Sequence, residues 1–299
     1  MEESFIRPTT ILVTGAEGQL GKELQQLSNH YSYNFLFTSK KDLSIDNFKT
    51  TKNFFEKHQI DFCINCAAYT AVDKAESEKE RAFAINAEAV GNFATICNEH
   101  QTRLIHISTD YVFNGASTVP YKEDDAVDPI GIYGASKLKG EELAFNNNPS
   151  TLIIRTSWVY SSFGNNFVKT MIRLMNEKES VNVIDDQYGC PTYATDLAAV
   201  IMKIIDESSA NNLSGRFNYC NEGITTWYKF ALAIKELTKS NCIVNPISAS
   251  QYTTAAKRPM YSVLDTNKIK KSLGITIPYW MHSLQKCLEA LGHQIPGTI

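Results

Sequence analysis

Tyr133 and Lys137 stand four residues apart in the segment Gly131-Ile-Tyr-Gly-Ala-Ser-Lys137. On a helix, side chains at this spacing project from the same face, about one turn apart. A lysine ammonium beside a phenol favours the phenolate, so we expect the pKa of Tyr133 to fall below its ordinary value of about 10. Such a tyrosine can serve as a general acid or base toward a carbonyl or an alcohol. The pair alone is a weak signal, because an exposed helix face can carry the same two residues.

A glycine-rich turn near the N-terminus strengthens this interpretation. The apolar segment Thr10–Thr14 predicts a β-strand, and Gly15-Ala-Glu-Gly-Gln-Leu-Gly21 joins it to a helix expected from Gln19 to about Ser28. Strand, glycine turn and helix together indicate a dinucleotide site, because glycines let the backbone approach a pyrophosphate and a helix N-terminus offers free N–H groups. The spacing is G-x-x-G-x-x-G rather than the more usual G-x-G-x-x-G, and an ordinary strand-to-helix turn is the alternative.

Together these motifs resemble the extended, sugar-nucleotide branch of the short-chain dehydrogenase/reductase superfamily. That branch places a serine or threonine upstream of the tyrosine, which here falls in Ile107-Ser-Thr-Asp-Tyr-Val-Phe113. Further segments make nearly the whole chain similar to the dTDP-4-dehydrorhamnose reductases. They are Asn65-Cys-Ala-Ala-Tyr-Thr-Ala-Val-Asp-Lys-Ala-Glu76, Arg155-Thr-Ser-Trp-Val-Tyr160, Gly164-Asn-Asn-Phe-Val-Lys169, Asp186-Gln-Tyr-Gly-Cys-Pro-Thr192 and Arg258-Pro259. Cys66 replaces a more usual alanine and Asn114 a frequent aspartate, and neither change touches a group expected to do chemistry.

Strand-like and helical patterns alternate through the first half of the chain. Strands are predicted near 10–14, 33–37, 61–66, 103–107 and 151–155, with helices near 19–29, 46–58, 76–99 and 133–147. This order predicts an α/β fold with a Rossmann-type, doubly wound parallel sheet.

The second half of the chain has a looser pattern. Helices are expected near 164–177, 194–207, 226–239 and 279–291, with short strands near 181–184 and 215–219. We therefore expect residues 1–160 to form the NAD(P)-binding domain and 161–299 to be mainly a smaller, C-terminal substrate-binding lobe. The resemblance implies that segments near 181–206 return to the first domain.

Composition excludes several classes of protein. The chain has 299 residues, of which 43% are hydrophobic and 20% charged. Its net charge is −3 with no long run of one sign, which argues against nucleic acid as the main partner, because nucleic acid would need a basic face. No apolar run approaches the ~20 residues of a membrane span, and the N-terminus does not resemble a signal peptide. Cys63 and Cys66 fit C-x-x-C, but in a strand they point to opposite faces, which favours reduced thiols. We expect a soluble, cytoplasmic protein.

Residues that follow predicted strands are the candidate cofactor contacts, and several are assigned by resemblance. With Tyr133 and Lys137, the set is Gly15, Gly18, Gln19, Leu20, Asp42, Leu43, Ala67, Ala68, Tyr69 and Thr70. The second strand ends in Thr38-Ser39-Lys40-Lys41, where an acidic residue would favour NAD. Hydroxyls and lysines suit a 2′-phosphate, so NADPH is favoured over NADH, with a solvated turn as the alternative.

The resemblance implies a reaction and a role for each catalytic candidate. NADPH would reduce the C4 ketone of dTDP-4-dehydro-β-L-rhamnose to dTDP-L-rhamnose, in nucleotide-sugar synthesis for cell-surface polysaccharide. Tyr133 would be the general acid, Lys137 would hold the nicotinamide ribose, and Thr109 would orient the carbonyl. The candidates for substrate contacts are Thr109, Asp110, Trp158, Asn166 and Arg258.

Other functions have to be weighed against the same residues, and the missing second carboxylate speaks against the first of them. A dehydratase of the superfamily places an Asp-Glu pair after the catalytic threonine, whereas Thr109 is followed by Asp110 and Tyr111. A 4-epimerase would use the same tyrosine and lysine with a recycled NAD. A non-catalytic, NADP-binding regulatory subunit of a partner enzyme, or an NADP-binding redox sensor, needs no turnover. A homodimer and a requirement for Mg²⁺ stay open.

Overall fold

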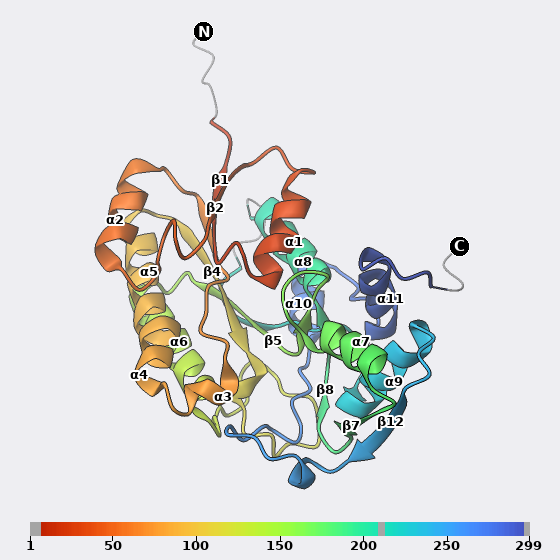
Figure 1. Ribbon diagram of the computed structural model, residues 1–299. Coiled ribbons are helices and arrows are strands. Elements are labelled where there is room, and N and C mark those ends of the chain that lie inside the picture. Colours follow the sequence, from red (N-terminus) through yellow and green to blue (C-terminus); the bar gives the residue numbers. More distant parts are fainter. Residues whose placement is uncertain (1–6, 209–212, 296–299) are drawn as a thin grey trace.

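The computed structural model describes residues 7–208 and 213–295, and a parallel sheet of six strands lies at its centre (Figure 1). The strands are β1 (Thr10–Thr14), β2 (Asn34–Thr38), β3 (Phe62–Asn65), β4 (Arg103–Thr109), β5 (Leu152–Thr156) and β10 (Gly215–Asn218). Their order in the sheet is β10-β5-β4-β3-β1-β2, and every neighbouring pair is parallel. The predicted doubly wound parallel fold is therefore confirmed.

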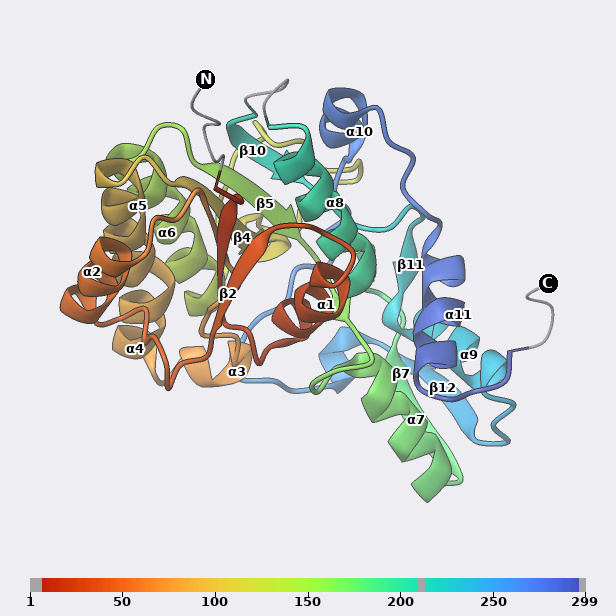
Figure 2. The ribbon, with the colours of Figure 1, turned by 90° about the horizontal axis from the view of Figure 1, so that it is seen from above.

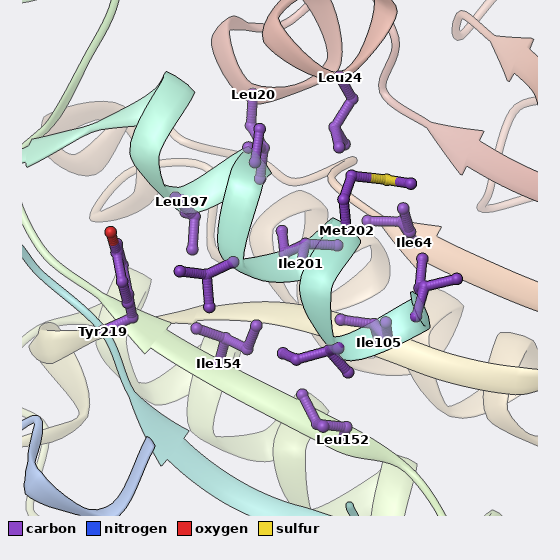
Figure 3. Packing of buried hydrophobic residues seen from close by; sticks show 14 of the residues in the cluster. Leu20, Leu24, Ile64, Ile105, Leu152, Ile154, Leu197, Ile201, Met202 and Tyr219 are labelled. Atoms are coloured by element: carbon purple, nitrogen blue, oxygen red, sulfur yellow. The ribbon is translucent and has the colours of Figure 1, made fainter. Parts of the chain in front are cut away.

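Helices cover both faces of this sheet (Figures 1 and 2). One face carries α1 (Gln19–Ser28) and α8 (Ala194–Asp206), and the other carries α2 (Phe48–Lys57), α5 (Ala89–Glu99) and α6 (Ile132–Asn147). Leu20 and Leu24 of α1 pack with Ile201 of α8 onto Ile105 and Ile154 of the strands (Figure 3). Strands buried on both faces need continuous apolar runs, which is the pattern that made them predictable.

The helix predicted over 76–99 is divided in the structure. Its parts are α4 (Lys79–Phe83), a π-helical segment η1 (Ala84–Glu88) and α5, and a short helix α3 (Val72–Ala75) precedes them. Asn86, in η1, accepts a hydrogen bond from Tyr69 N at 2.8 Å and donates to Tyr69 O at 3.0 Å and to the Ser136 hydroxyl at 3.0 Å. A Cβ atom on Gly140 would lie 2.0 Å from Asn86 O, so η1 and α6 meet at backbone contact. The irregular turn thus ties the loop after β3 to α6.

A second hydrophobic core holds the smaller lobe together. It contains α7 (Phe167–Glu177), α9 (Trp227–Leu237), α11 (Trp280–Ala290) and the parallel pair β7 (Ser180–Ile184) and β12 (Ile243–Ile247). The structure differs from the expected division along 181–206, because β7 lies in the lobe whereas α8 packs on the sheet. Residues 215–218 and helix α10 (Asn267–Leu273) also belong to the sheet's side of the molecule.

The remaining elements are short. They are η2 (Asp110–Val112), β6 (Val159–Tyr160) paired with β9 (Thr192–Tyr193), β8 (Tyr188–Gly189) paired with β11 (Thr225–Thr226), and η3 (Ala249–Gln251). Within residues 7–208 and 213–295, no helix combines the length and apolar character that crossing a membrane requires.

Candidate active site

A cleft of about 750 Å³ opens beyond the carboxyl ends of β1, β3, β4 and β5. The strand order reverses between β1 and β3, and ligands of doubly wound sheets bind at such a switch point. The predicted residues that line the cleft are Gly15, Gly18, Gln19, Leu20, Leu43, Ala67, Ala68, Tyr69, Thr70, Thr109, Asp110, Tyr133, Lys137 and Trp158. Topology thus brings together residues from six separate parts of the sequence.

The glycine-rich turn fits a dinucleotide. Gly15 has φ +66°, and a Cβ atom on it would lie 2.7 Å from Ala67 N, so only glycine lets the ends of β1 and β3 approach this closely. Gly18 is the N-cap of α1 and makes no side-chain cap, and the first turn of α1 carries no acidic residue. The free N–H groups and the positive end of the helix dipole therefore suit a pyrophosphate.

Three predicted site residues lie outside the lining of this cleft. The Asp42 carboxylate accepts hydrogen bonds from Ser39 N at 2.9 Å and from the Ser39 hydroxyl at 2.7 Å, and so shapes the turn after β2. The Asn166 amide donates to Gln19 Oε1 at 2.9 Å while its oxygen caps α7. Arg258 lines a second cavity, of about 890 Å³, on the lobe. No feature of the sequence distinguishes Asp42, Asn166 and Arg258 from the predicted residues that do line the cleft.

Arg258 is held by an acidic partner. Its guanidinium donates to both carboxylate oxygens of Asp73, at 2.8 and 3.3 Å. Burial lowers the pKa of Arg258, but the hydrogen bond and the charge of Asp73 raise it by more. The guanidinium therefore stays charged. The ion pair joins the loop that carries Arg258, just before the β-bridge at Tyr261, to Asp73 in α3 on the nucleotide-binding side.

Tyr133 and Lys137 both line the cleft from the first turns of α6, as their spacing predicts. The expected depression of the tyrosine pKa is wrong for this structure. Burial raises the pKa of Tyr133 to about 12, and a hydrogen bond with Thr109 offsets only part of this rise. Lys137 is not among the groups that shift this pKa, and its amine donates to Ile107 O at 2.6 Å. Tyr133 therefore keeps its proton at neutral pH, as a general acid must.

Thr109 and Asp110 form the floor of the cleft at the end of β4. The Thr109 hydroxyl donates to Asp110 Oδ1 at 3.0 Å and accepts from Tyr111 N at 3.2 Å. Burial raises the pKa of Asp110 to about 6, although hydrogen bonds from Ser262 and Thr109 lower it. A threonine and a buried carboxyl are thus available to the hydroxyl and carbonyl groups of a small polar substrate.

Trp158 has a strained backbone and a constrained indole. Its φ is +47°, in the left-handed region that non-glycine residues seldom adopt. The indole stacks on Trp227 with ring centroids 3.6 Å apart and an interplanar angle of 10°. A Cβ atom on Gly189 would come within 2.5 Å of Trp158 Cε2. One face of the ring is already covered, so a sugar can contact only the part of the indole that lines the cleft.

The cleft also contains residues that the sequence interpretation missed. Arg81 lies over the ring of Tyr69 at 5.8 Å, and Cys66 and Ser108 join the lining. His106 lies fully buried directly behind Lys137. Its signal in the sequence is a single histidine inside the apolar strand 103–107, a pattern that core packing explains equally well. In the part of the chain that the structure describes, no three or more His, Cys, Asp or Glu side chains are grouped to hold a metal ion.

Known proteins resemble the chain along nearly its whole length. The family model described as the RmlD substrate binding domain matches residues 9–293. The spore coat polysaccharide biosynthesis protein SpsK of Bacillus subtilis is 39% identical over 283 residues, covering 94% of this chain and 97% of that protein. A dTDP-4-dehydrorhamnose reductase of Aggregatibacter actinomycetemcomitans is 37% identical over 284 residues, covering 92% and 97%.

Solved structures agree. A dTDP-4-dehydrorhamnose reductase of Bacillus anthracis, crystallised in complex with NADP, superposes with a TM-score of 0.91 at 38% identity, covering 95% of this chain and all of that one. The matched range contains the glycine turn, the Tyr133–Lys137 pair and the lobe. The family predicted from the motifs is confirmed, and the chain belongs to the dTDP-4-dehydrorhamnose reductases.

Proposed function

We propose that the protein reduces the C4 ketone of dTDP-4-dehydro-β-L-rhamnose with NADPH, giving dTDP-L-rhamnose for cell-surface polysaccharide. The observation that carries the proposal is that one cleft contains Thr109, Tyr133 and Lys137 beside a glycine turn suited to a dinucleotide. Membership of the reductase family, and the NADP bound to a relative of 38% identity, support the same reaction.

Bound NADPH supplies the hydride that the ketone needs. Tyr133 donates its phenolic proton to the C4 oxygen, because its raised pKa keeps the proton in place at neutral pH until an oxyanion develops. Thr109 orients the same oxygen once its hydroxyl rotates away from Asp110. Lys137 would hold the nicotinamide ribose from the floor of the cleft.

The sugar and the nucleotide would occupy adjoining spaces. Asp110 accepts hydrogen bonds from sugar hydroxyls, and Trp158 borders the sugar with its uncovered edge. Arg258 would reach the diphosphate from the second cavity, which requires a rearrangement of its ion pair with Asp73. Asn166 contributes indirectly, because its amide donates a hydrogen bond to Gln19 of the glycine-rich segment.

Replacement of Lys40 tests the cofactor preference. Lys40 lines the cleft in the turn after β2, whereas Lys41 beside it does not. We expect Lys40→Gln to raise the Kd for NADPH about tenfold and to leave the Kd for NADH unchanged, because a hydrogen bond to a charged phosphate contributes about 1.5–3 kcal/mol. Cofactor titrations should show almost no change in Lys41→Gln. Equal losses for both cofactors, or for both variants, would contradict a specific contact between Lys40 and the 2′-phosphate, and no loss at all would identify Lys40 as a solvated turn residue.

Replacement of Thr109 tests the orientation of the ketone. Thr109→Val keeps the branched shape but removes the hydroxyl, and we expect kcat to fall about a hundredfold, as happens when one donor to a developing oxyanion is lost. Thr109→Ser restores the hydroxyl and should recover most of the rate. Steady-state kinetics with both variants separate chemistry from packing, because a valine variant with normal kcat would exclude the role.

The reaction itself is tested by mixing the purified protein with NADPH and dTDP-4-dehydro-β-L-rhamnose and following loss of the NADPH absorbance. We expect turnover, and identification of dTDP-L-rhamnose as product establishes the substrate. NADPH binding without turnover would favour the regulatory-subunit alternative, which a search for a co-purifying enzyme then examines. Size-exclusion chromatography with and without Mg²⁺ determines whether the protein is a homodimer.

A further inference from the structure

A line of hydrogen-bonded side chains runs beneath the cleft, from β1 through β3 and β4 to α6. The Thr14 hydroxyl donates to Asn65 Oδ1 at 2.7 Å, and Asn65 Nδ2 lies 3.2 Å from His106 Nδ1. His106 Nε2 in turn lies 3.2 Å from the amine of Lys137. Thr14, Asn65 and His106 are fully buried, so no water competes for these contacts.

The orientation of the Asn65 amide follows from its neighbours. Ala67 N lies 3.2 Å from Asn65 Oδ1, and a backbone N–H can only donate, so the amide oxygen faces this side. The amide nitrogen must then donate to His106 Nδ1, which accepts through its lone pair. A neutral imidazole that accepts at Nδ1 carries its proton on Nε2. Asn65 therefore selects one tautomer of His106.

This tautomer presents an N–H group to Lys137. An ammonium has no lone pair and cannot accept that hydrogen, whereas a neutral amine accepts it and still donates to Ile107 O. Two facing donors repel each other, so the contact with His106 favours the neutral amine. We propose that His106, oriented by Asn65, is a positioning residue that directs the Lys137 amine and sets its affinity for a proton.

The other groups around Lys137 act in known directions. Burial lowers the pKa of Lys137 to about 8, while the charge of Glu141 on the same helix raises it. Cys66 after β3 is neutral in this range, because burial raises the pKa of its thiol. Tyr133, one turn earlier on α6, is protonated at neutral pH. Burial, and then the charge of Lys137, lower the pKa of His106 far below its ordinary value, so the ring stays neutral.

Nitrogen NMR of the full-length protein, labelled with ¹⁵N-histidine, tests the tautomer directly. The chain has 6 histidines, and the signals of His106 are those that disappear in His106→Gln. We expect a neutral ring with its proton on Nε2, and a shift of this nitrogen as Lys137 titrates. Lys137→Met should abolish that shift. A proton on Nδ1 in the wild type overturns the proposal, whatever the variants do.

Asn65→Asp supplies the decisive contrast, because it is nearly isosteric and reverses the polarity of the line. The carboxylate accepts from Thr14, Ala67 N and His106 Nδ1–H, so His106 Nε2 becomes an acceptor for the ammonium. We expect the tautomer to invert and the Lys137 titration to move upward by about one pH unit or more. An unchanged titration contradicts the proposal. Asn65→Leu, which removes the donor, should leave a mixture of tautomers and covers the case in which the aspartate variant fails to fold.

The consequence for turnover rests on the proposed function, whereas the NMR measurements do not. If charged Lys137 supports the reduction, kcat falls as pH rises through the pKa of Lys137, and Asn65→Asp moves this alkaline limb upward. A purely structural role would instead lower kcat by the same factor at every pH. Inversion of the tautomer in a protein without reductase activity would support the assignment of His106 and reject the proposed reaction.

Discussion

Replacement of Tyr133 by phenylalanine is expected to leave NADPH binding intact and to lower kcat by about 10²–10⁴-fold, the usual contribution of a positioned proton donor. The phenyl ring keeps the contacts of Tyr133 in the cleft, including its edge-on packing against Tyr111 at 5.5 Å. Only the phenolic hydroxyl, with its acidic proton and its hydrogen bond to Thr109, is lost. The effect should therefore appear in kcat rather than in the Kd for the cofactor.

Tyr111→Phe is the matched control for this experiment. Tyr111 also lines the cleft, lies against Tyr133, and carries a hydroxyl whose pKa is raised by burial. We expect at most a few-fold change in kcat, because Tyr111 is not on α6 beside Lys137. Single-turnover reduction, with cofactor titrations in parallel, distinguishes the two variants. Normal turnover in Tyr133→Phe would remove the tyrosine from the mechanism and leave the acid to be found elsewhere, with Asp110 the next candidate.

Local patterns predicted the elements of the sheet well. The five apolar segments became β1 to β5, because a strand covered on both faces must be apolar throughout. Pairing between distant segments could not be predicted in this way. The sequence of Gly215–Asn218 indicates a short strand but not the strand with which it pairs. Its place beside β5 depends on the chain returning through α8. The break at η1 was missed for a similar reason. Asn86 forms hydrogen bonds with Tyr69 and Ser136, which are distant in the sequence, and no local pattern indicates these contacts.

The candidate site shows the same limit. Spacing alone placed Tyr133 and Lys137 on one helix face, and strand ends placed Thr109 and Ala67 in the cleft. The pKa of Tyr133 could not be predicted, because its direction depends on burial, and Lys137 is not among the groups that shift it. Proton affinity in this cleft is a property of tertiary contacts rather than of the motif.

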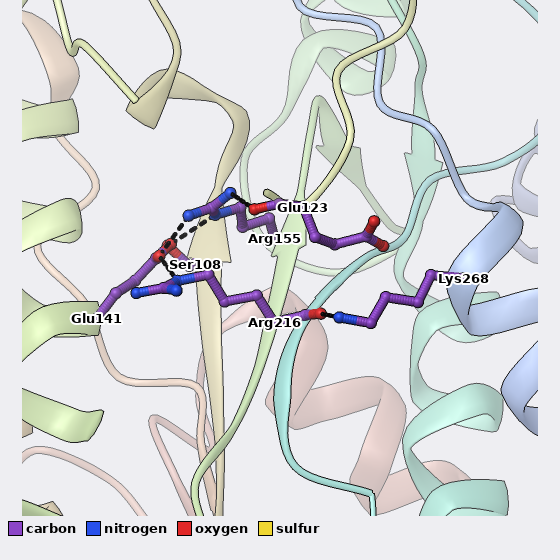
Figure 4. A network of polar contacts seen from close by, with 6 residues as sticks. All are labelled: Ser108, Glu123, Glu141, Arg155, Arg216 and Lys268. Carbon is purple, nitrogen blue, oxygen red and sulfur yellow. Dashed lines mark hydrogen bonds and ion pairs between the residues drawn. The ribbon is translucent and has the colours of Figure 1, made fainter. Parts of the chain in front are cut away.

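Replacement of Glu141 is expected to cause the largest loss of stability. Glu141 lies one turn beyond Lys137 on α6, and its carboxylate accepts from Ser108 at 2.6 Å, from Arg155 at 2.7 and 2.9 Å, and from Arg216 at 3.1 Å (Figure 4). Glu141→Leu leaves the buried Arg155 without its carboxylate. We expect the free energy of unfolding to fall by about 3–5 kcal/mol, the usual cost of removing one residue of a buried ion pair and leaving the other charge uncompensated. Chemical denaturation measures the change.

The neighbouring residue on the same helix provides the control. Glu142 pairs with Lys139 at 2.9 Å, but its side chain is 46% exposed, and such surface pairs contribute about 0–1 kcal/mol. Glu142→Gln should therefore leave the denaturation midpoint nearly unchanged. Glu141→Gln keeps the shape and an acceptor but removes the charge. Its loss of unfolding free energy should lie between those of Glu142→Gln and Glu141→Leu. Equal effects at 141 and 142 would show that the network contributes no more than a surface ion pair.

The pH dependence of this difference has a definite sign. Burial raises the pKa of Glu141, but Arg155, Ser108 and Arg216 lower it more, so the folded pKa lies below the unfolded value of about 4.3. A carboxyl of this kind stabilises the fold above the unfolded pKa, and the contribution is lost as pH falls through the folded pKa. The gap between wild type and Glu141→Gln should therefore be full at neutral pH and close in acid. Because Ser108 precedes Thr109, protonation of Glu141 should also loosen the floor of the cleft, so that acid unfolding and loss of cofactor binding occur together.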